Sequence, residues 1–110
     1  MFEGEEALSW YKIASARGDA GAQYGEGAIC LERARNSETG RIIDGDAFEK
    51  AKDLILRAAA QENADAELAL YSERLLFDID TEEARLFLKR SAIHGNDAAR
   101  ELCRELEIAF

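Results

Sequence analysis

The sequence predicts an all-α fold, an α-α superhelix of about three helix-turn-helix repeats that occupies residues 1–110 as a single domain. The 110 residues contain no proline and no valine, whereas alanine, leucine, glutamate and arginine are abundant, and this composition favours helices. Apolar residues recur at spacings of three and four, as at Leu68, Tyr71 and Leu75, without the alternation typical of strands. Three stretches of the chain also align with one another without gaps, which is the signature of a repeat protein.

Six helices are expected, arranged as three pairs. Their expected ranges are 5–17 and 20–34, 47–61 and 64–77, and 82–93 and 97–108, within repeats at about 6–34, 46–77 and 80–110. The polar stretch "NSETGRIID" joins the first two pairs. We expect it to form an exposed loop, with Ile42 and Ile43 packing back onto the helices.

Residues that favour helix ends lie at the expected boundaries. Gly18 and Gly95 suit the left-handed conformation that often follows the last turn of a helix. Asp19, Asn63 and Asn96 can accept a backbone hydrogen bond at the start of the second helix of each pair. Two further helix starts match the capping-box pattern, Asp46 with Glu49 and Asp80 with Glu83.

The repeated window places residues of similar size at the same positions. It covers residues 7–22, 51–66 and 84–99, so the second window lies 44 positions after the first and the third lies 33 positions after the second. In the first repeat the pattern runs through Ala7, Trp10 with Tyr11, Ala14, Gly18 and Ala22. The small residues and the aromatic ring share one stripe of the first helix, so we expect Trp10 and Tyr11 to pack in the core rather than against a ligand.

The stretch "GDAGAQYGEG" at residues 18–27 resembles the hallmark of the Sel-one-like repeat family, short α-solenoid units related to tetratricopeptide repeats. The matching residues are Ala7, Trp10, Tyr11, Ala14, Gly18, Ala22 and Gly27. The resemblance extends over about residues 6–108 and implies an α-solenoid that takes part in protein complexes. The chain departs from the family pattern at Glu26, Cys30, Glu62, Tyr71, Cys103 and Arg104, most of all in the third repeat.

The excess of acidic residues argues against several classes of function. The chain has 23 Asp and Glu against 14 Lys and Arg, a formal net charge of −9. Nucleic acids and anionic membranes bind cationic surfaces, so we expect neither as a partner. The first residues are acidic where a signal peptide is basic, and no apolar run approaches the ~20 residues of a membrane span, so we expect a cytoplasmic protein.

No combination of residues predicts an active site, a metal site or a cofactor site. His94 is the only histidine, and at the expected end of a helix it is explained better by the helix dipole than by a functional role. Cys30 and Cys103 lie 73 positions apart, at positions that are apolar in the family, which favours buried free thiols over disulfide, metal or redox chemistry. Asp44 and Asp46 lack the further oxygen ligands of a calcium loop. We therefore expect a protein that is not an enzyme and has no cofactor.

Basic residues concentrate on the first helix of each pair, which lines the concave face in solenoids of this kind. The predicted partner-binding residues are Lys12, Arg57, Arg85, Lys89 and Arg90. A basic, partly apolar stripe of this kind would hold an acidic segment or a C-terminal carboxylate of a partner protein. The alternative is a solvated face whose cations pair with neighbouring acids such as Asp53.

Two other functions stay open on the sequence. The second helices carry acidic residues that we expect on the convex face: Glu26, Glu32, Glu67, Glu73, Glu101 and Glu105. Such a face suits a small inhibitor or immunity-type protein that masks a partner enzyme. A third hypothesis is a regulatory or capping fragment of a larger solenoid, which predicts an exposed apolar edge and self-association.

Overall fold

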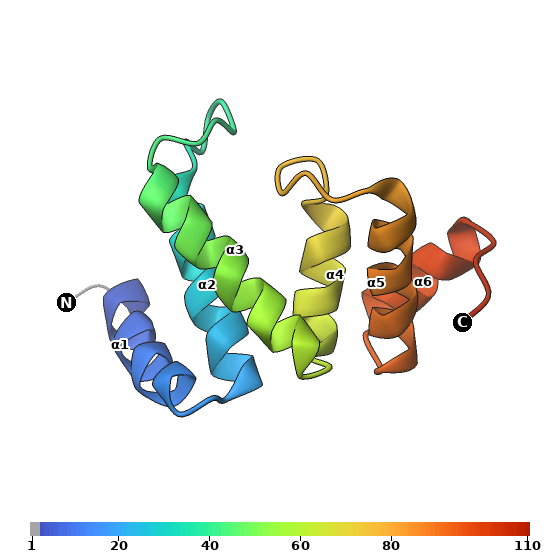
Figure 1. Ribbon diagram of the computed structural model, residues 1–110, viewed down its shortest axis with the longest axis horizontal. Helices are drawn as coiled ribbons and strands as arrows, with labels where there is room; N and C mark the ends of the chain where they lie inside the picture. The colour runs from blue at the N-terminus through green and yellow to red at the C-terminus, as the bar shows by residue number, and fades with distance from the viewer. Residues whose placement is uncertain (1–2) are drawn as a thin grey trace. The chain divides into compact units, whose positions relative to one another are not determined.

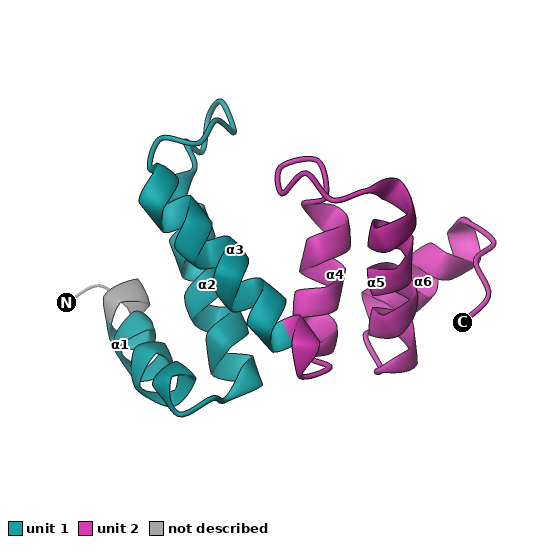
Figure 2. Cartoon of the chain, viewed as in Figure 1, with its two compact units in different colours: residues 1–58 teal, residues 59–110 magenta. Residues whose placement is uncertain are grey.

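The computed structural model describes the backbone of residues 3–110 and the side chains of residues 6–110. Within this part of the chain every named element is a helix, as predicted, and a single β-bridge joins Arg35 to Ile42. The helices are α1 (Glu3–Ala16), α2 (Ala20–Ala34), α3 (Gly45–Ala60), α4 (Ala64–Ser72), α5 (Thr81–Ile93) and α6 (Asp97–Glu105) (Figure 1). The chain forms two compact units, residues 1–58 and residues 59–110, with the boundary inside the last turn of α3 (Figure 2).

Close helix packing in the first unit explains the glycines of α2. The ring of Tyr11 on α1 lies against Gly25, where an added Cβ would come within 2.8 Å of the ring. Gly27 faces α3, where an added Cβ would lie 2.9 Å from Ile55 Cγ1 and 3.2 Å from Leu54 Cβ. The two glycines therefore let α2 approach α1 on one side and α3 on the other, with the buried Ala51 and Ile55 beneath Gly27.

The core of the second unit forms where α4, α5 and α6 meet. Leu88 and Ala92 of α5 and Ala99 and Cys103 of α6 are fully buried in one apolar cluster. Partly buried side chains close this cluster from α4 and from the C-terminal end: Leu68, Tyr71, Leu102 and Ile108. The alternation of small and large residues lets α4 and α6 both pack on α5.

The predicted helix caps are present at the second helix of each pair. The side chains of Asp19, Asn63 and Asn96 accept hydrogen bonds from the backbone N–H three residues later, at 2.8, 2.9 and 2.8 Å. Gly18 and Gly95 have φ of 88° and 100°, the left-handed conformation predicted for them. These boundaries follow from short-range chemistry, which explains why the start of each second helix is predicted to the residue.

Of the two N-cap residues predicted for capping boxes, one is confirmed as an N-cap. Asp80 caps α5 and accepts from the N–H of Glu82 at 3.1 Å. Asp46 does not cap α3, because the helix already begins at Gly45 and the carboxylate of Asp44 accepts from the N–H of Ala47. Backbone hydrogen bonds from Ile43 and Asp44 to the carbonyl of Ala34 hold the chain so that Asp44 is the last residue before the helix.

Two helices end three or more residues earlier than expected, and the loop also differs. The prediction for the helix at 64–77 is wrong at its end, because the helix ends at Ser72, after which the carbonyl of Tyr71 accepts from the backbone N–H and the Nη1 of Arg74, at 3.3 and 2.9 Å. The last helix likewise ends at Glu105 and not at 108, with Leu106 as its C-cap. Ile43 was expected to pack onto the helices, yet it is 68% exposed, and only Ile42 is partly buried at the β-bridge.

Candidate interaction surfaces

One predicted group of cations lies together around a hollow on the first helix of the third pair. Arg85 and Lys89 are four residues apart on α5, so they share one helix face, and Leu86 lies beside them. With Ile108 they line a hollow of about 430 Å³, to which Glu82 and Glu107 also contribute. Leu86 is 50% exposed, so the hollow presents apolar surface to solvent beside the two cations. We call Arg85, Leu86, Lys89 and Ile108 the α5 surface.

The other predicted partner-binding residues are placed less distinctively. Arg57 on α3 forms an ion pair with Asp53 at 3.0 Å, and both side chains are largely exposed. This is the solvated pair that the sequence left as an alternative, and such pairs are worth about 0.3–0.5 kcal/mol. Arg90 lies over the ring of Phe87, 5.9 Å from its centroid, and Lys12 is exposed on α1. Among the predicted cations, Arg85 and Lys89 are therefore the two that the structure brings together around one hollow.

Two of the acidic residues expected on a convex surface are interior. Glu26 is 5% exposed, and its carboxylate lies 3.0 Å from the ammonium of Lys50. This hydrogen bond raises the pKa of Lys50. Glu67 is 1% exposed, and its Oε1 lies 2.7 Å from Nδ1 of His94. The prediction that both carboxylates lie on the surface is therefore wrong. Each is buried and is paired with a side chain from another helix, Glu26 with Lys50 and Glu67 with His94.

His94 is the C-cap residue of α5, where the sequence placed it at a helix end. Besides its bond to Glu67, its Nε2 lies 3.9 Å from a carboxylate oxygen of Glu62. Two neighbouring contacts also join the start of α4 to the end of α5: Ser91 Oγ donates to the carbonyl of Ala64 at 2.7 Å, and Asn96 Nδ2 donates to Asp65 at 2.9 Å. His94 thus belongs to a polar seam between α4 and the α5–α6 turn, a structural role that sequence spacing alone does not reveal.

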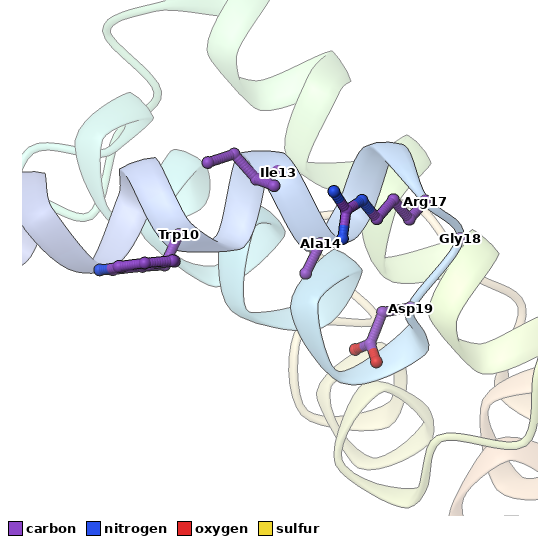
Figure 3. A pocket seen from close by; sticks show the side chains of 6 residues that line it. All are labelled: Trp10, Ile13, Ala14, Arg17, Gly18 and Asp19. Atoms are coloured by element: carbon purple, nitrogen blue, oxygen red, sulfur yellow. The ribbon is translucent and has the colours of Figure 1, made fainter.

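A second hollow lies on α1. It measures about 510 Å³ and is lined by Trp10, Ile13, Ala14, Arg17, Gly18 and Asp19. Figure 3 shows Trp10 and Ala14 along one side of α1, with Asp19 beyond them at the start of α2. The prediction that Trp10 and Tyr11 pack in the core is wrong for Trp10, whose side chain is 66% exposed. The ring of Tyr11 contacts Gly25 but is itself 37% exposed.

The cysteines, possible metal ligands and possible membrane spans remain to be described. Both cysteines are free and buried, and burial raises the pKa of the Cys30 and Cys103 thiols. Among the side chains of residues 6–110 no three His, Cys, Asp or Glu are grouped as they would be to hold a metal ion. None of the described helices is both long enough and apolar enough to span a bilayer.

Comparison with protein families, with curated proteins and with solved structures found no match to this chain.

Proposed function

We propose that this protein is a non-enzymatic interaction module, a short solenoid of three Sel-one-like repeats, that binds an acidic segment of a partner protein on the α5 surface. The single observation that carries the proposal is the hollow lined by Arg85 and Lys89 together with Leu86 and Ile108. Among the described residues no carboxylate lies within ion-pair distance of Arg85 or Lys89, in contrast to Arg57. Charge-assisted hydrogen bonds from these two cations would orient the acidic segment.

Apolar contact would supply the rest of the binding free energy. Leu86 and Ile108 present aliphatic surface in the same hollow, and cations beside apolar surface suit a segment in which acidic and apolar residues alternate or adjoin. Glu82 and Glu107 also line the hollow and oppose an acidic segment, so such a segment must contact Arg85 and Lys89 directly. The expected partner is an acidic peptide or protein segment, with no nucleic acid, membrane or cofactor involved.

The solenoid part of the proposal rests on the repeat. In each unit a second helix packs on the following first helix, as Gly27 of α2 does on α3 and as Ala64 of α4 does on Ser91 of α5. The competing inhibitor hypothesis needs an acidic masking surface. Of the six acidic residues named for it, Glu26 and Glu67 are interior, which leaves less acidic surface for that function.

The experiment is affinity capture from a native cell extract with two variants of equal net charge. In the first, Arg85→Glu and Lys89→Glu reverse the α5 surface. In the matched control, Arg33→Glu and Arg41→Glu reverse two exposed arginines of the other unit. We expect the wild type and the control to retain the same protein partner and the α5 variant to lose it, with helical circular dichroism unchanged in all three.

Retention of the partner by the α5 variant would reject the proposed surface. If a Glu101→Lys, Glu105→Lys variant lost the partner instead, the acidic inhibitor hypothesis would replace it. A partner that is lost in the control as well would indicate a net-charge effect and would equally contradict a defined α5 site.

A further inference from the structure

The side of α1 that carries Trp10 and Ala14, together with Arg17 just after the helix, has no helix packed on it among the described residues. We call these residues, with Asp19, the α1 face. Trp10 is 66% exposed and Ala14 is only partly buried, and they line the hollow of about 510 Å³ (Figure 3). Exposure of a large aromatic ring beside small residues is unusual for a helix that also packs well on its other side.

The third repeat shows what covers this face when it is occupied. Ala84 lies 77 positions after Ala7, so Ala14, Arg17 and Asp19 correspond to Ser91, His94 and Asn96. All three of these equivalents bond to α4: Ser91 to the carbonyl of Ala64, His94 to Glu67 and Asn96 to Asp65. Ser91 is fully buried, whereas Ala14 at the same position of α1 is not.

In the second repeat, the first helix α3 is likewise covered by the preceding helix α2. Leu54 of α3 corresponds to Trp10, because the windows are 44 positions apart. Leu54 is 6% exposed and lies beneath α2, where an added Cβ on Gly27 would come within 3.2 Å of its Cβ. At the position of Ala14, Ala58 of α3 and Ser91 of α5 are both fully buried, so two of the three repeats cover this side of the first helix with the second helix of the preceding pair.

We propose that the α1 face binds an amphipathic helix of a partner protein that places a carboxylate opposite Arg17. Where the third repeat has His94 paired with Glu67, the first has a permanent cation. Among the described residues no carboxylate lies within ion-pair distance of the Arg17 guanidinium. A glutamate at the Glu67 position of the incoming helix would form that pair at the Arg17 end of the hollow, about two helical turns from Trp10.

The differences between the two faces also define the rest of the ligand. Asn96 uses its amide to donate to Asp65, but Asp19 has only acceptor oxygens, and one of them already accepts from the N–H of Ala22. The incoming helix must therefore carry a donor, such as asparagine, where α4 has Asp65. Ser91 donates its hydroxyl to a backbone carbonyl of α4, whereas Ala14 has no hydroxyl to donate. The contact at Ala14 is therefore apolar, which favours small apolar residues on the incoming helix at that point.

A second copy of this chain fits this description poorly. Its α6 has Arg100 at the position of Glu67 and Glu101 at the position of Leu68. Docked on the α1 face, α6 would set Arg100 against Arg17 and a charge where α4 has an apolar side chain. This mismatch disfavours a second copy as the occupant of the α1 face. This surface is separate from the α5 surface, and its test is independent of the proposed function.

The test uses the single tryptophan, Trp10, as its reporter, because it lies within the face itself. The probe is a peptide of residues 62–77 with Asp65→Asn, held helical by a hydrocarbon cross-link placed away from the contact positions and verified by circular dichroism. This probe contains no tryptophan. Titration into the full chain should shift the Trp10 emission to shorter wavelength and saturate, because the ring leaves water when the helix docks.

Variants decide whether the charge pair is the one proposed. Arg17→Glu should weaken the probe about tenfold, which corresponds to about 1.4 kcal/mol, and a probe with Glu67→Lys should bind the Arg17→Glu chain as well as the original pair. Arg85→Glu is the control and should not alter the titration. No emission shift with a helical probe, or equal binding by Arg17→Glu, would overturn the proposal. A concentration-dependent shift of the chain alone, with dimer seen by sedimentation, would assign the face to a second copy instead.

Discussion

Two Gly→Ala substitutions in α2 test the close packing on which the repeat fold depends, because they share a helix and differ in their surroundings. An added Cβ at Gly27 would lie 2.9 Å from Ile55 Cγ1 and 3.2 Å from the backbone oxygen of Ala51. At Gly21 the only near atom is Asp19 Oδ1, at 3.4 Å, which is an ordinary contact. Both substitutions gain helix propensity, worth up to about 1 kcal/mol. Only Gly27→Ala must also push two packed helices apart.

Overpacking of this kind costs about 1–3 kcal/mol, so Gly27→Ala should be less stable than Gly21→Ala by about that amount. Urea unfolding followed by circular dichroism at 222 nm measures the difference, and thermal unfolding should show a gap of several degrees for a chain of this size. Gly21→Ala itself should be neutral or slightly stabilising. Equal stability of the two variants would show that α2 and α3 do not approach closely at Gly27, and the argument from small residues would fail.

Three further predictions concern buried polar groups, thiols and a cap. Lys50→Met leaves the carboxylate of Glu26 buried without its partner and should reduce the free energy of unfolding by about 1–3 kcal/mol at pH 7, whereas adding Glu26→Leu should restore most of it. Because burial raises the pKa of Cys30 and Cys103, the folded state disfavours their thiolates; their contribution to stability is complete below the ordinary thiol pKa and is lost as the pH rises through the raised values. Stability measured by urea unfolding should therefore fall above about pH 9, and iodoacetamide at pH 8.5 should alkylate the native thiols far more slowly than the unfolded ones. Asn63→Ala removes the cap of α4 and should cost about 1 kcal/mol by the same unfolding assay, and no loss would contradict the capping role.

Local features of this fold could be predicted from the sequence because they depend on near neighbours in the chain. The caps at Asp19, Asn63 and Asn96 each bond a backbone N–H three residues away, and the left-handed glycines follow directly from the helix ends. The all-helical class follows from composition and periodicity, which are equally local. The arrangement of the helices in pairs follows from the three aligned sequence windows.

The features that were mispredicted depend on contacts distant in sequence. Glu67 and His94 are 27 positions apart, and no periodicity in either segment indicates that the carboxylate is buried against the imidazole. A signal existed for Glu26, since it shares its repeat position with Leu70 and Cys103, which are both buried. Trp10 shows the converse: the repeat pattern identifies a docking position but not whether a helix covers it.

The cations on the first helices illustrate a further limit. The sequence predicts that Arg57, Arg85 and Lys89 lie on first helices, but only the structure shows that Arg57 pairs with Asp53 while Arg85 and Lys89 line a hollow with apolar side chains. Side-chain pairing at positions four apart depends on rotamers, and the sequence does not specify these. The α5 surface therefore contains only two cations of the predicted stripe, Arg85 and Lys89.

The central claim is that this protein binds a partner through the α5 surface, and calorimetric titration of the captured partner tests it most directly. We expect Arg85→Glu with Lys89→Glu to weaken binding at least tenfold and Arg33→Glu with Arg41→Glu to leave the dissociation constant unchanged. Added salt should weaken binding of the wild type more than that of the α5 variant. Equal affinity of the α5 variant and the wild type for the same partner would contradict the claim.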